Sequence, residues 1–454
     1  MAKKQYSVDM INGPILKSII AFVAPLIFAN FLQLMYNAAD IIVVSRFAGS
    51  EAMASVGATS SISNLMICLF VGFSVGASVI VSRKFGAHDD EGVHCAVHTS
   101  MLLSIIAGFI AMITGISLSS FVLKLMGTPE GNVFDGAVLY MRIMFIGMPA
   151  NLVYNFGATV LRAIGDTKRP LYILSFSGIV NVVLNFVFVI RFHMSVAGVA
   201  WATAISNYIS AFAVVFTLVR ADGAYKLVFK KLKLYKEELL EILKVGLPAG
   251  IQGSMFGISN TLIQSGVNSF GAAAIAGNSA ASNIEAFVYT AMNAFSQASI
   301  TGVSQNYGAK NEKGIYKSYN TCALCVTVVG FLVGLLSAIF GRQLLGIYIT
   351  DSDAAIDYGM VRVVLTGVTY FFCGLMEVQV GMLRGIGYST MAMINSLVGV
   401  CGFRVLWITF VLPLYRSTHV LYLCWPISWV LVVVMNLICY QIIKKKAIQK
   451  MYES

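Results

Sequence analysis

Three acidic residues lie inside long apolar stretches of the sequence, namely Asp40, Glu285 and Glu377. A charged side chain at the centre of a membrane helix costs at least about 2.5–3.5 kcal/mol, so each of them is a candidate functional group. A carboxylate in such a place can hold a small cation, carry a proton or bind a cationic substrate. The two glutamates could bind a cationic substrate or carry a proton, and an ion pair of Glu377 with Arg404 is a further alternative.

The carboxylate of Asp40 has polar companions in other apolar stretches. Asn181 and Asn185 are four residues apart and share one helix face, and Thr203 lies in the next apolar stretch. Counted at about 1.5 Å per residue from the helix ends, all four lie in the outer half of a membrane. One carboxylate, two amides and one hydroxyl offer hard oxygen donors for a small cation, and Na⁺ is the candidate. The alternative is a network of hydrogen bonds between helices.

Other polar, aromatic and Met residues suit a cavity that accepts varied organic molecules. Gln33, Tyr36 and Asp40 recur at intervals of three and four and share one helix face. Adaptable Met and aromatic contacts favour promiscuous binding, and ordinary packing between helices is the alternative. The candidate substrate-binding residues are Gln33, Tyr36, Tyr154, Asn155, Glu285, Phe287, Met292, Phe295 and Glu377.

The composition indicates what must position these residues. Of the 454 residues, 58% are hydrophobic and 11% are charged, whereas soluble domains carry about 25% charged residues. Apolar stretches long enough to cross a membrane as helices occur twelve times, which predicts an all-α integral membrane protein. The predicted spans are residues 15–44, 52–82, 93–119, 136–161, 170–190, 195–219, 239–266, 274–304, 317–340, 358–383, 389–413 and 418–443.

The basic residues predict the topology of these spans. If both termini lie on one side, 23 of the 31 Lys and Arg residues fall on that side, Lys3, Lys4, Arg162 and Arg384 among them, and five fall on the other. Cytoplasmic loops carry the excess of Lys and Arg, so both termini are expected in the cytoplasm. The net charge of +11 sits in short clusters between the spans, which indicates membrane topology and contact with lipids and argues against nucleic-acid binding.

The two halves of the chain repeat one another. One constant shift along the sequence pairs Gly49 with Gly271, the stretch Gly86–Ala87 with Gly308–Ala309, and Gly165 with Gly387. Each half holds six spans, so both enter the membrane from the same side and the repeat is parallel. The predicted domains are an amino-terminal lobe over 1–220, a cytoplasmic linker over 221–238 and a carboxy-terminal lobe over 239–454. Transporters of this plan bind substrate between the halves.

Motifs typical of enzymes and metal sites have simpler explanations. Gly72, Ser74 and Gly76 match a hydrolase motif but lie within an apolar stretch, where small residues favour a helix contact. Cys322 and Cys325 form a C-x-x-C pair without a second pair or a nearby histidine, so packing explains them. His94 and His98, one helical turn apart, are interpreted as anchors at the membrane surface. We therefore expect no enzymatic activity and no cofactor.

The sequence also resembles the multidrug and toxic compound extrusion (MATE) family, and more closely its DinF-type branch. The stretches that carry the resemblance are QLMYNAADIIVVSRFAG at 33–49, LRAIGDTKRP at 161–170, NVVLN at 181–185, GVAWATAIS at 198–206, SQNYGAKN at 304–311 and MEVQVGMLRGIGYS at 376–389. The resemblance implies export of organic cations and other xenobiotics in exchange for inward Na⁺ or H⁺. It places Asp40, Asn181, Asn185 and Thr203 at the cation-coupling site. Some members carry Asp where this chain has Asn185.

The resemblance further implies a protein of the bacterial cytoplasmic membrane, and we expect a monomer. The rival function is a flippase of lipid-linked glycans, which has a related two-lobe plan and moves a pyrophosphate. Its cavity should be cationic, whereas the deep charges here are acidic apart from Arg404. The sequence therefore favours the antiporter.

Overall fold

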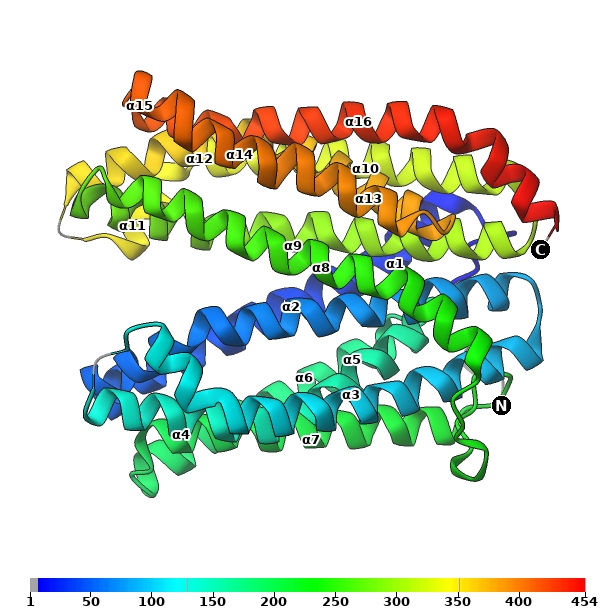
Figure 1. The fold of residues 1–454 in the computed structure, drawn as a ribbon, viewed down its shortest axis with the longest axis horizontal. Coiled ribbons are helices and arrows are strands. Elements are labelled where there is room, and N and C mark those ends of the chain that lie inside the picture. Colours follow the sequence, from blue (N-terminus) through cyan, green and yellow to red (C-terminus); the bar gives the residue numbers. More distant parts are fainter. Residues whose placement is uncertain (1–6, 129, 351, 454) are drawn as a thin grey trace. The chain divides into compact units, whose positions relative to one another are not determined.

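The computed structural model describes residues 7–128, 130–350 and 352–453, and this part of the chain is helical without any strand. Lys3 and Lys4, which the topology prediction counts among the cytoplasmic charges, lie outside the described residues. In the first half (Figure 1) the helices are α1 (Ile15–Val43), which continues into the π-helical turn η1 (Val44–Ala48), α2 (Ser50–Gly86), α3 (Asp90–Leu125), α4 (Asn132–Ile146), α5 (Met148–Ala163), α6 (Lys168–Asn185) with its π-helical turn η2 (Phe186–Arg191), and α7 (Ser195–Val219).

The second half follows the same plan after a short 3₁₀ turn, η3 (Phe229–Lys231). Its helices are α8 (Lys236–Asn268), α9 (Ala272–Gly308), α10 (Glu312–Ile339), α11 (Gly341–Tyr348), α12 (Asp353–Gly385), α13 (Ser389–Ser396), η4 (Leu397–Gly402), α14 (Phe403–Leu406), η5 (Trp407–Val411), α15 (Leu412–Leu414) and α16 (Thr418–Glu453). The run from α13 to α15 is one continuous helical segment, with π-helical turns in two places.

The twelve predicted spans all correspond to helical segments of this structure. Within the described residues, nine segments are long and apolar enough to cross a membrane, and the bent pair α4–α5 makes a tenth. The remaining two are α8 and α9, with 33 and 37 residues. Helix α9 holds several Asn and Ser side chains besides Glu285. The predicted division between the spans 239–266 and 274–304 is confirmed, since α8 ends at Asn268 and α9 begins at Ala272.

Backbone conformation bears out the internal repeat. Gly49 and its partner Gly271 have φ angles of +89° and +95°, and Gly165 and Gly387 have +91° and +93°. Such angles are strained for residues that carry a Cβ atom, which explains why glycine stands at both members of each pair. His88 and Lys310, also a pair under the shift, have φ angles of +55° and +54°. Equivalent turns thus have equivalent geometry in the two halves.

The chain divides into two compact units whose borders differ from the predicted domains. Among the described residues, one unit comprises 7–8 together with those of 24–246, and the other comprises 9–23 together with those of 247–453. The division therefore runs through α1 just before Pro25 and through α8 just before Pro248. We call the units the amino unit and the carboxy unit. The predicted linker 221–238 belongs to the amino unit as a whole.

Contacts to α3 explain why the linker packs with the amino unit. The backbone N–H of Val228 donates to His98 Nε2 at 3.0 Å, and the N–H of Tyr235 donates to Thr99 Oγ1 at 3.1 Å. The His98 Nδ1 atom lies 2.7 Å from the carbonyl oxygen of His94, whose ring stacks on that of His98 with centroids 3.9 Å apart. His98 therefore contacts the backbone at residues 94 and 228, and the two histidine rings stack on each other. The described residues contain no group of three His, Cys, Asp or Glu side chains suited to a metal.

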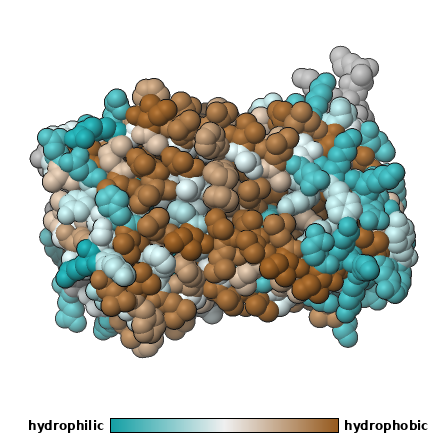
Figure 2. Space-filling model, turned by 90° about the horizontal axis from the view of Figure 1, so that it is seen from above, coloured by the Kyte–Doolittle hydropathy of each residue, from teal (hydrophilic) through white to brown (hydrophobic). Residues whose placement is uncertain are grey.

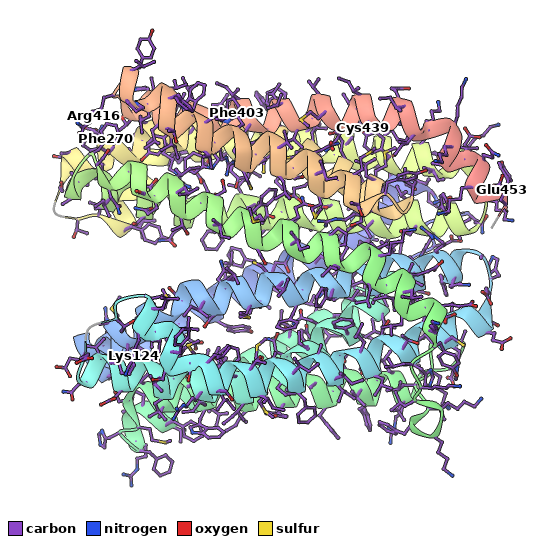
Figure 3. All side chains as sticks on the ribbon, in the orientation of Figure 1. Lys124, Phe270, Phe403, Arg416, Cys439 and Glu453 are labelled. Atoms are coloured by element: carbon purple, nitrogen blue, oxygen red, sulfur yellow. The ribbon has the colours of Figure 1, made fainter. Side chains whose placement is uncertain are left out.

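The distribution of side chains follows the predicted topology. On the face shown in Figure 2, hydrophobic residues cover the middle of the helices and hydrophilic residues gather at both ends. In the carboxy unit, Arg416 and Phe270 lie at one end and Glu453 at the other (Figure 3). Arg416 Nη2 donates to the carbonyl oxygen of Ser269 at 3.0 Å, so two loops that were predicted on the same side meet.

Two features of the helices were not predicted. The span 136–161 is broken, because α4 and α5 meet at Gly147 with a bend of 44°. Pro149 at the start of α5 cannot continue the hydrogen bonds of α4, and Gly108 of α3 packs so closely that a Cβ atom there would lie 2.5 Å from the Cα of Pro149. The short helix α11 also lies outside the predicted spans. The interpretation of Gly76 as a helix contact agrees with its position against the α8 backbone at Ile242.

Candidate functional site

A chain of hydrogen bonds in the amino unit joins the four predicted cation-coupling residues. The side-chain amide of Asn185 donates to Asp40 Oδ1 and to Asn181 Oδ1, the latter at 3.3 Å. The amide of Asn181 donates in turn to Thr203 Oγ1 at 3.4 Å, and the Thr203 hydroxyl is also a partner of the Asp40 carboxylate. Three helices, α1, α6 and α7, therefore meet at one carboxylate.

The local conformation of the helices positions these groups. Asn181 and Asn185 lie one turn apart on α6 and are buried, with 6% and 0% of their surface exposed. Both α1 and α6 change to π-helical turns just beyond the site, at Val44 and at Phe186. Single π-helical turns inside helices are frequent at functional sites. The π-helical turns therefore lie directly next to the residues that meet at Asp40.

The donor set fits a small hard cation. The Asn185 Oδ1 atom is buried and has no hydrogen-bond partner, although buried polar atoms are usually paired. The two ends of an amide are nearly indistinguishable by shape, so rotation of this side chain would present an oxygen instead of an N–H to Asp40. Carboxylate, amide and hydroxyl oxygens would then converge from three helices. Among the described residues, no other acidic side chain belongs to this hydrogen-bond chain.

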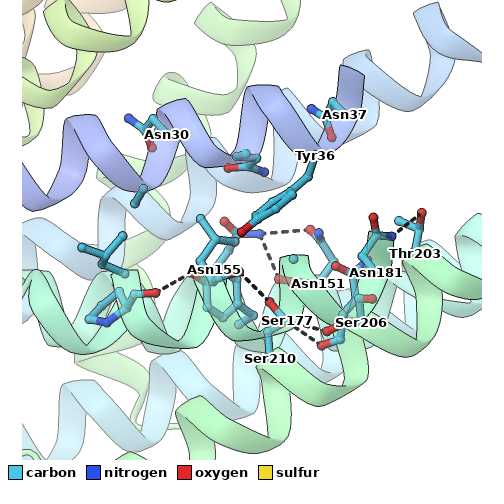
Figure 4. A pocket seen from close by; sticks show the side chains of 18 of the residues that line it. Asn30, Tyr36, Asn37, Asn151, Asn155, Ser177, Asn181, Thr203, Ser206 and Ser210 are labelled. Atoms are coloured by element: carbon cyan, nitrogen blue, oxygen red, sulfur yellow. Dashed lines mark hydrogen bonds between the residues drawn. The ribbon is translucent and has the colours of Figure 1, made fainter. Parts of the chain in front are cut away.

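Asp40 lines a cavity of about 120 Å³ in the amino unit. Figure 4 shows the side chains of this lining, with Tyr36, Asn155 and Thr203 among those labelled. Helices α1, α5, α6 and α7 form its walls. Four predicted substrate-binding residues, Gln33, Tyr36, Tyr154 and Asn155, lie in its lining together with Asp40, Asn181 and Thr203. The other lining residues are Leu26, Ala29, Asn30, Asn37, Asn151, Arg162, Thr167, Pro170, Leu171, Leu174, Ser177, Gly178, Ser206, Asn207 and Ser210.

Close packing fixes the aromatic side chains of this cavity. The Tyr36 hydroxyl donates to the carbonyl oxygen of Ser175 at 3.3 Å, and its ring lies directly on Gly178, where a Cβ atom would come within 1.8 Å of the ring. The Tyr154 hydroxyl donates to the carbonyl oxygen of Pro170 at 3.3 Å. Tyr36 therefore depends on a glycine of the facing helix.

Sequence reasoning missed most of the polar lining. Asn30, Gln33, Asn37 and Asp40 follow one another at three or four residues along α1, yet the prediction used only two of them. On α7 the polar residues Thr203, Ser206, Asn207 and Ser210 form a similar row. A polar stripe at helical spacing on an otherwise apolar span was the available signal.

In the carboxy unit, Glu285 is paired with a buried arginine. Arg362 Nε donates to Glu285 Oε1 at 2.9 Å, its Nη2 atom donates to Oε2, and Thr366 Oγ1 donates to Oε1 at 2.6 Å. Arg362 Nη1 donates to Asn278 Oδ1 at 2.6 Å, and the guanidinium lies 4.3 Å from the centre of the Trp425 ring. The expectation that Arg404 is the single deep base is thus corrected, because Arg362 of α12 is 7% exposed and neutralises Glu285.

The alternative pairing of Glu377 with Arg404 is not what the structure shows. Arg404 donates to Ser428 Oγ at 3.3 Å and to Asn260 Oδ1 at 3.2 Å. Glu377 is 7% exposed, and its neighbours are Arg384 and the hydroxyl of Tyr289. Glu377 therefore interacts with polar partners other than Arg404 within the carboxy unit.

Three further predicted substrate-binding residues lie on α9. Met292 and Phe295 are buried at 0% and 4% exposure, and the Met292 sulfur packs against Gly374 of α12. Phe287 is 37% exposed. None of these residues, nor Glu285 or Glu377, lines the cavity of the amino unit. The structure therefore brings together the amino-unit candidates and leaves the carboxy-unit candidates elsewhere.

The comparisons with known proteins agree with this architecture. The sequence profile of the MatE family matches residues 25–187 and 248–408, so each half of the internal repeat matches it separately. Probable multidrug resistance protein YpnP of Bacillus subtilis (strain 168) is 28% identical over 401 residues, covering 86% of this chain and 87% of that protein. Probable multidrug resistance protein NorM of Thermotoga maritima is 24% identical over 392 residues, covering 85% and 83%.

Solved structures confirm the predicted fold of twelve helices in two lobes. An outward-facing multidrug resistance MATE family transporter of the MOP superfamily matches with a TM-score of 0.87 and 22% identity, over 100% of both chains. A MOP superfamily transporter from Pyrococcus furiosus matches with a TM-score of 0.85 and 22% identity, over 99% of both chains.

Proposed function

Because the chain belongs to the MatE family, we propose that it is an antiporter that exports organic cations and other xenobiotics in exchange for inward Na⁺ or H⁺. Its relatives support the substrate class, since YpnP and NorM are described as probable multidrug resistance proteins and MepA of Staphylococcus aureus as a multidrug export protein. The positive-inside distribution of Lys and Arg supports a protein of the bacterial cytoplasmic membrane with both termini inside.

One observation carries the proposal, namely that Asp40 is shared between a set of oxygen donors and a cavity. Asn181, Asn185 and Thr203 are its hydrogen-bonded neighbours. Asp40 also lines the cavity that holds Gln33, Tyr36, Tyr154 and Asn155. An ion on Asp40 and a cationic substrate in the cavity would both depend on the same negative charge. Competition for that charge is a direct way to couple their movements.

The exchange follows from this competition. Na⁺ held by Asp40 and the neighbouring oxygens, or a proton on the carboxylate, would cancel the charge that attracts an organic cation. Protonation would also weaken the hydrogen bond from Asn185, because a carboxylic acid is a poorer acceptor than a carboxylate. The contact of α1 with α6 and α7 would then change with the ion. A ligand shifts a conformational equilibrium only through its different affinities for the two states.

The test uses purified protein in proteoliposomes with Na⁺ and H⁺ gradients imposed separately. We expect one of the gradients to drive ethidium transport in the opposite direction. In Asp40→Asn the gradient should no longer drive it, whereas Glu51→Gln, which changes an exposed acid at the start of α2, should behave like the wild type. Ethidium transport that follows neither gradient would contradict the antiport mechanism, and an unchanged Asp40→Asn would contradict the role of Asp40.

A further inference from the structure

The end of the cavity that lies away from Asp40 carries a basic residue. Arg162 stands in the last turn of α5, and Thr167 is the residue before α6, and both line the cavity. The sequence analysis counted Arg162 among the charges of a cytoplasmic loop, but the structure places it inside the unit. The first and last lining residues of α6, Pro170 and Asn181, are eleven residues apart, which is roughly 16.5 Å along the helix.

The polar groups at this end lack partners. The Arg162 Nε atom and the Thr167 Oγ1 atom are buried without a hydrogen-bond partner, and Thr167 is 1% exposed. Throughout the described ranges, no acid lies within ion-pair distance of the Arg162 guanidinium. The nearest acid in sequence, Asp166, pairs with Arg169 Nε at 3.2 Å and accepts from the N–H groups of residues 168 and 169. Its charge is therefore directed to the start of α6.

The carboxy unit shows how the repeat neutralises the equivalent arginine. Arg384, the partner of Arg162 under the shift, donates through Nη2 to Gln252 Oε1 at 2.8 Å and lies beside Glu377. The position of Glu377 is held by Asn155 in the amino unit, so the acid is missing there. Both arginines have an unpartnered Nε, and the difference lies in the acid and in the open cavity. A helix C-terminus favours a cation only weakly beside the cost of a buried unpaired charge.

The geometry points to a binding subsite for an organic carboxylate, formed by Arg162 and Thr167 at the end of the substrate cavity opposite Asp40. The planar guanidinium matches the two oxygens of a carboxylate, and the hydroxyl of Thr167 can donate a further hydrogen bond. With Asp40 at the other end, the cavity has one negative and one positive pole. The substrates it suits best are zwitterions that carry an amine and a carboxylate. This inference rests on the proposed transport function and refines its substrate class.

Two fluorescent dyes that differ only at the carboxylate test the subsite. Tetramethylrhodamine carries a carboxylate, and tetramethylrhodamine methyl ester is a pure cation. Binding to the purified full chain is measured by fluorescence anisotropy. We expect the wild type to bind the acid about tenfold more tightly than the ester, as a charge-assisted hydrogen-bonded pair gives. Arg162→Gln should abolish this preference by weakening the acid alone, and Thr167→Val should reduce it by about threefold.

Arg142→Gln is the matched control. It removes an arginine from a membrane span of the same unit, one that contacts Ser119 and does not line the cavity, so the preference for the acid should remain. Equal binding of the two dyes by the wild type would overturn the inference, as would an equal loss of both dyes in Arg162→Gln. If Arg162→Gln does not fold, the wild-type comparison and Thr167→Val decide. If a gradient drives transport of the ester but the protein does not bind the acid more tightly than the ester, the subsite is overturned and the proposed function stands. If the protein binds neither dye, the proposed function is contradicted as well.

Discussion

Asp40 of the amino unit and Glu285 of the carboxy unit both lie within long apolar helices, but their surroundings are opposite in kind. In the amino unit Asp40 has neutral partners, Asn181, Asn185 and Thr203, and opens onto a cavity. In the carboxy unit Glu285 is held by Arg362 through two hydrogen bonds and by Thr366 through a third. A charge that the protein balances itself is available to hold helices together. A charge left without a counter-ion is available to ligands.

The repeat makes this comparison informative, because the backbone is alike where the chemistry differs. Under the shift that defines the repeat, Asn181 and Asn185 correspond to Phe403 and Trp407. Arg162 and Arg384 occupy equivalent positions, yet only Arg384 has an acid beside it. The two units therefore share a backbone plan but differ in their side chains. Among the described residues of the amino unit, these differences leave Asp40 and Arg162 without a charged partner at the cavity.

The largest expected effect comes from breaking the ion pair of the carboxy unit. Glu285→Ala leaves Arg362 buried without its acid and should lower the free energy of unfolding by about 3–5 kcal/mol. The double variant Glu285→Leu/Arg362→Met replaces the pair with apolar groups and should recover most of that loss. The measurement is the unfolding midpoint in mixed micelles with increasing SDS.

The matched change in the amino unit gives the contrast. Asp40→Asn removes an acid with neutral neighbours, so we expect less than about 1 kcal/mol of change in the same unfolding assay, of the order measured for hydrogen bonds between membrane helices. A loss as large as that of Glu285→Ala would show that Asp40 is a structural residue. A double variant as unstable as Glu285→Ala would contradict the account of the pair.

A smaller effect is expected at Gly178, whose contact with Tyr36 exists only in the amino unit. The equivalent position in the carboxy unit is Val400. Gly178→Ala adds a methyl group where a Cβ atom would meet the Tyr36 ring at 1.8 Å, so the ring must move, at a cost of about 1–3 kcal/mol. We expect weaker ethidium binding with a folded protein. Gly257→Ala, where a Cβ atom meets nothing within 4 Å, is the control, and equal effects of the two variants would argue against a role for the Tyr36 position.

Small effects on stability are also expected at two helix caps that the two units share. Asp89 caps α3 by accepting from the N–H of Gly92 at 2.8 Å, and Asn311 caps α10 by accepting from the N–H of Gly314 at 3.0 Å. Replacing either by Ala should cost about 1 kcal/mol in the free energy of unfolding. The hydrogen bond from Gly92 holds the pKa of Asp89 below its ordinary value.

The two caps should differ in their response to pH. Because the pKa of Asp89 is lowered on folding, its contribution is complete above the unfolded value of about 4 and is lost as the pH falls through the folded value. The cost of Asp89→Ala should therefore shrink in acid, while that of Asn311→Ala stays constant. The test is the unfolding midpoint of both variants at neutral pH and near pH 3. A parallel response of the two variants would contradict the capping account.

Features that are visible in the order of residues along the chain could be predicted from the sequence. Long apolar stretches indicated the twelve spans, the spacing of Asn181 and Asn185 put them on one face, and a single shift revealed the repeat. The break at Gly147 escaped prediction because a hydropathy pattern averages over many residues and does not register a local bend.

Contacts between distant residues were beyond the sequence. Glu285 and Arg362 are 77 residues apart, and no periodicity links them, so the ion pair of this acid became evident only from the fold. Arg162 was assigned to a loop because it lies near a span end, although its side chain lines the cavity. That Arg162 has no acid beside it among the described residues, whereas Arg384 does, can be seen only in the three-dimensional structure.

The central claim is that ion and substrate compete for the charge of Asp40, and their linked binding tests it most directly. The measurement is the affinity of the purified protein for ethidium at a series of Na⁺ concentrations and pH values. In the wild type, raising Na⁺ or lowering the pH should weaken ethidium binding, and by linkage ethidium should weaken binding of the ion by the same factor. In Asp40→Asn the ethidium affinity should be independent of both. An ethidium affinity that varies with Na⁺ and pH in Asp40→Asn as it does in the wild type would contradict the account.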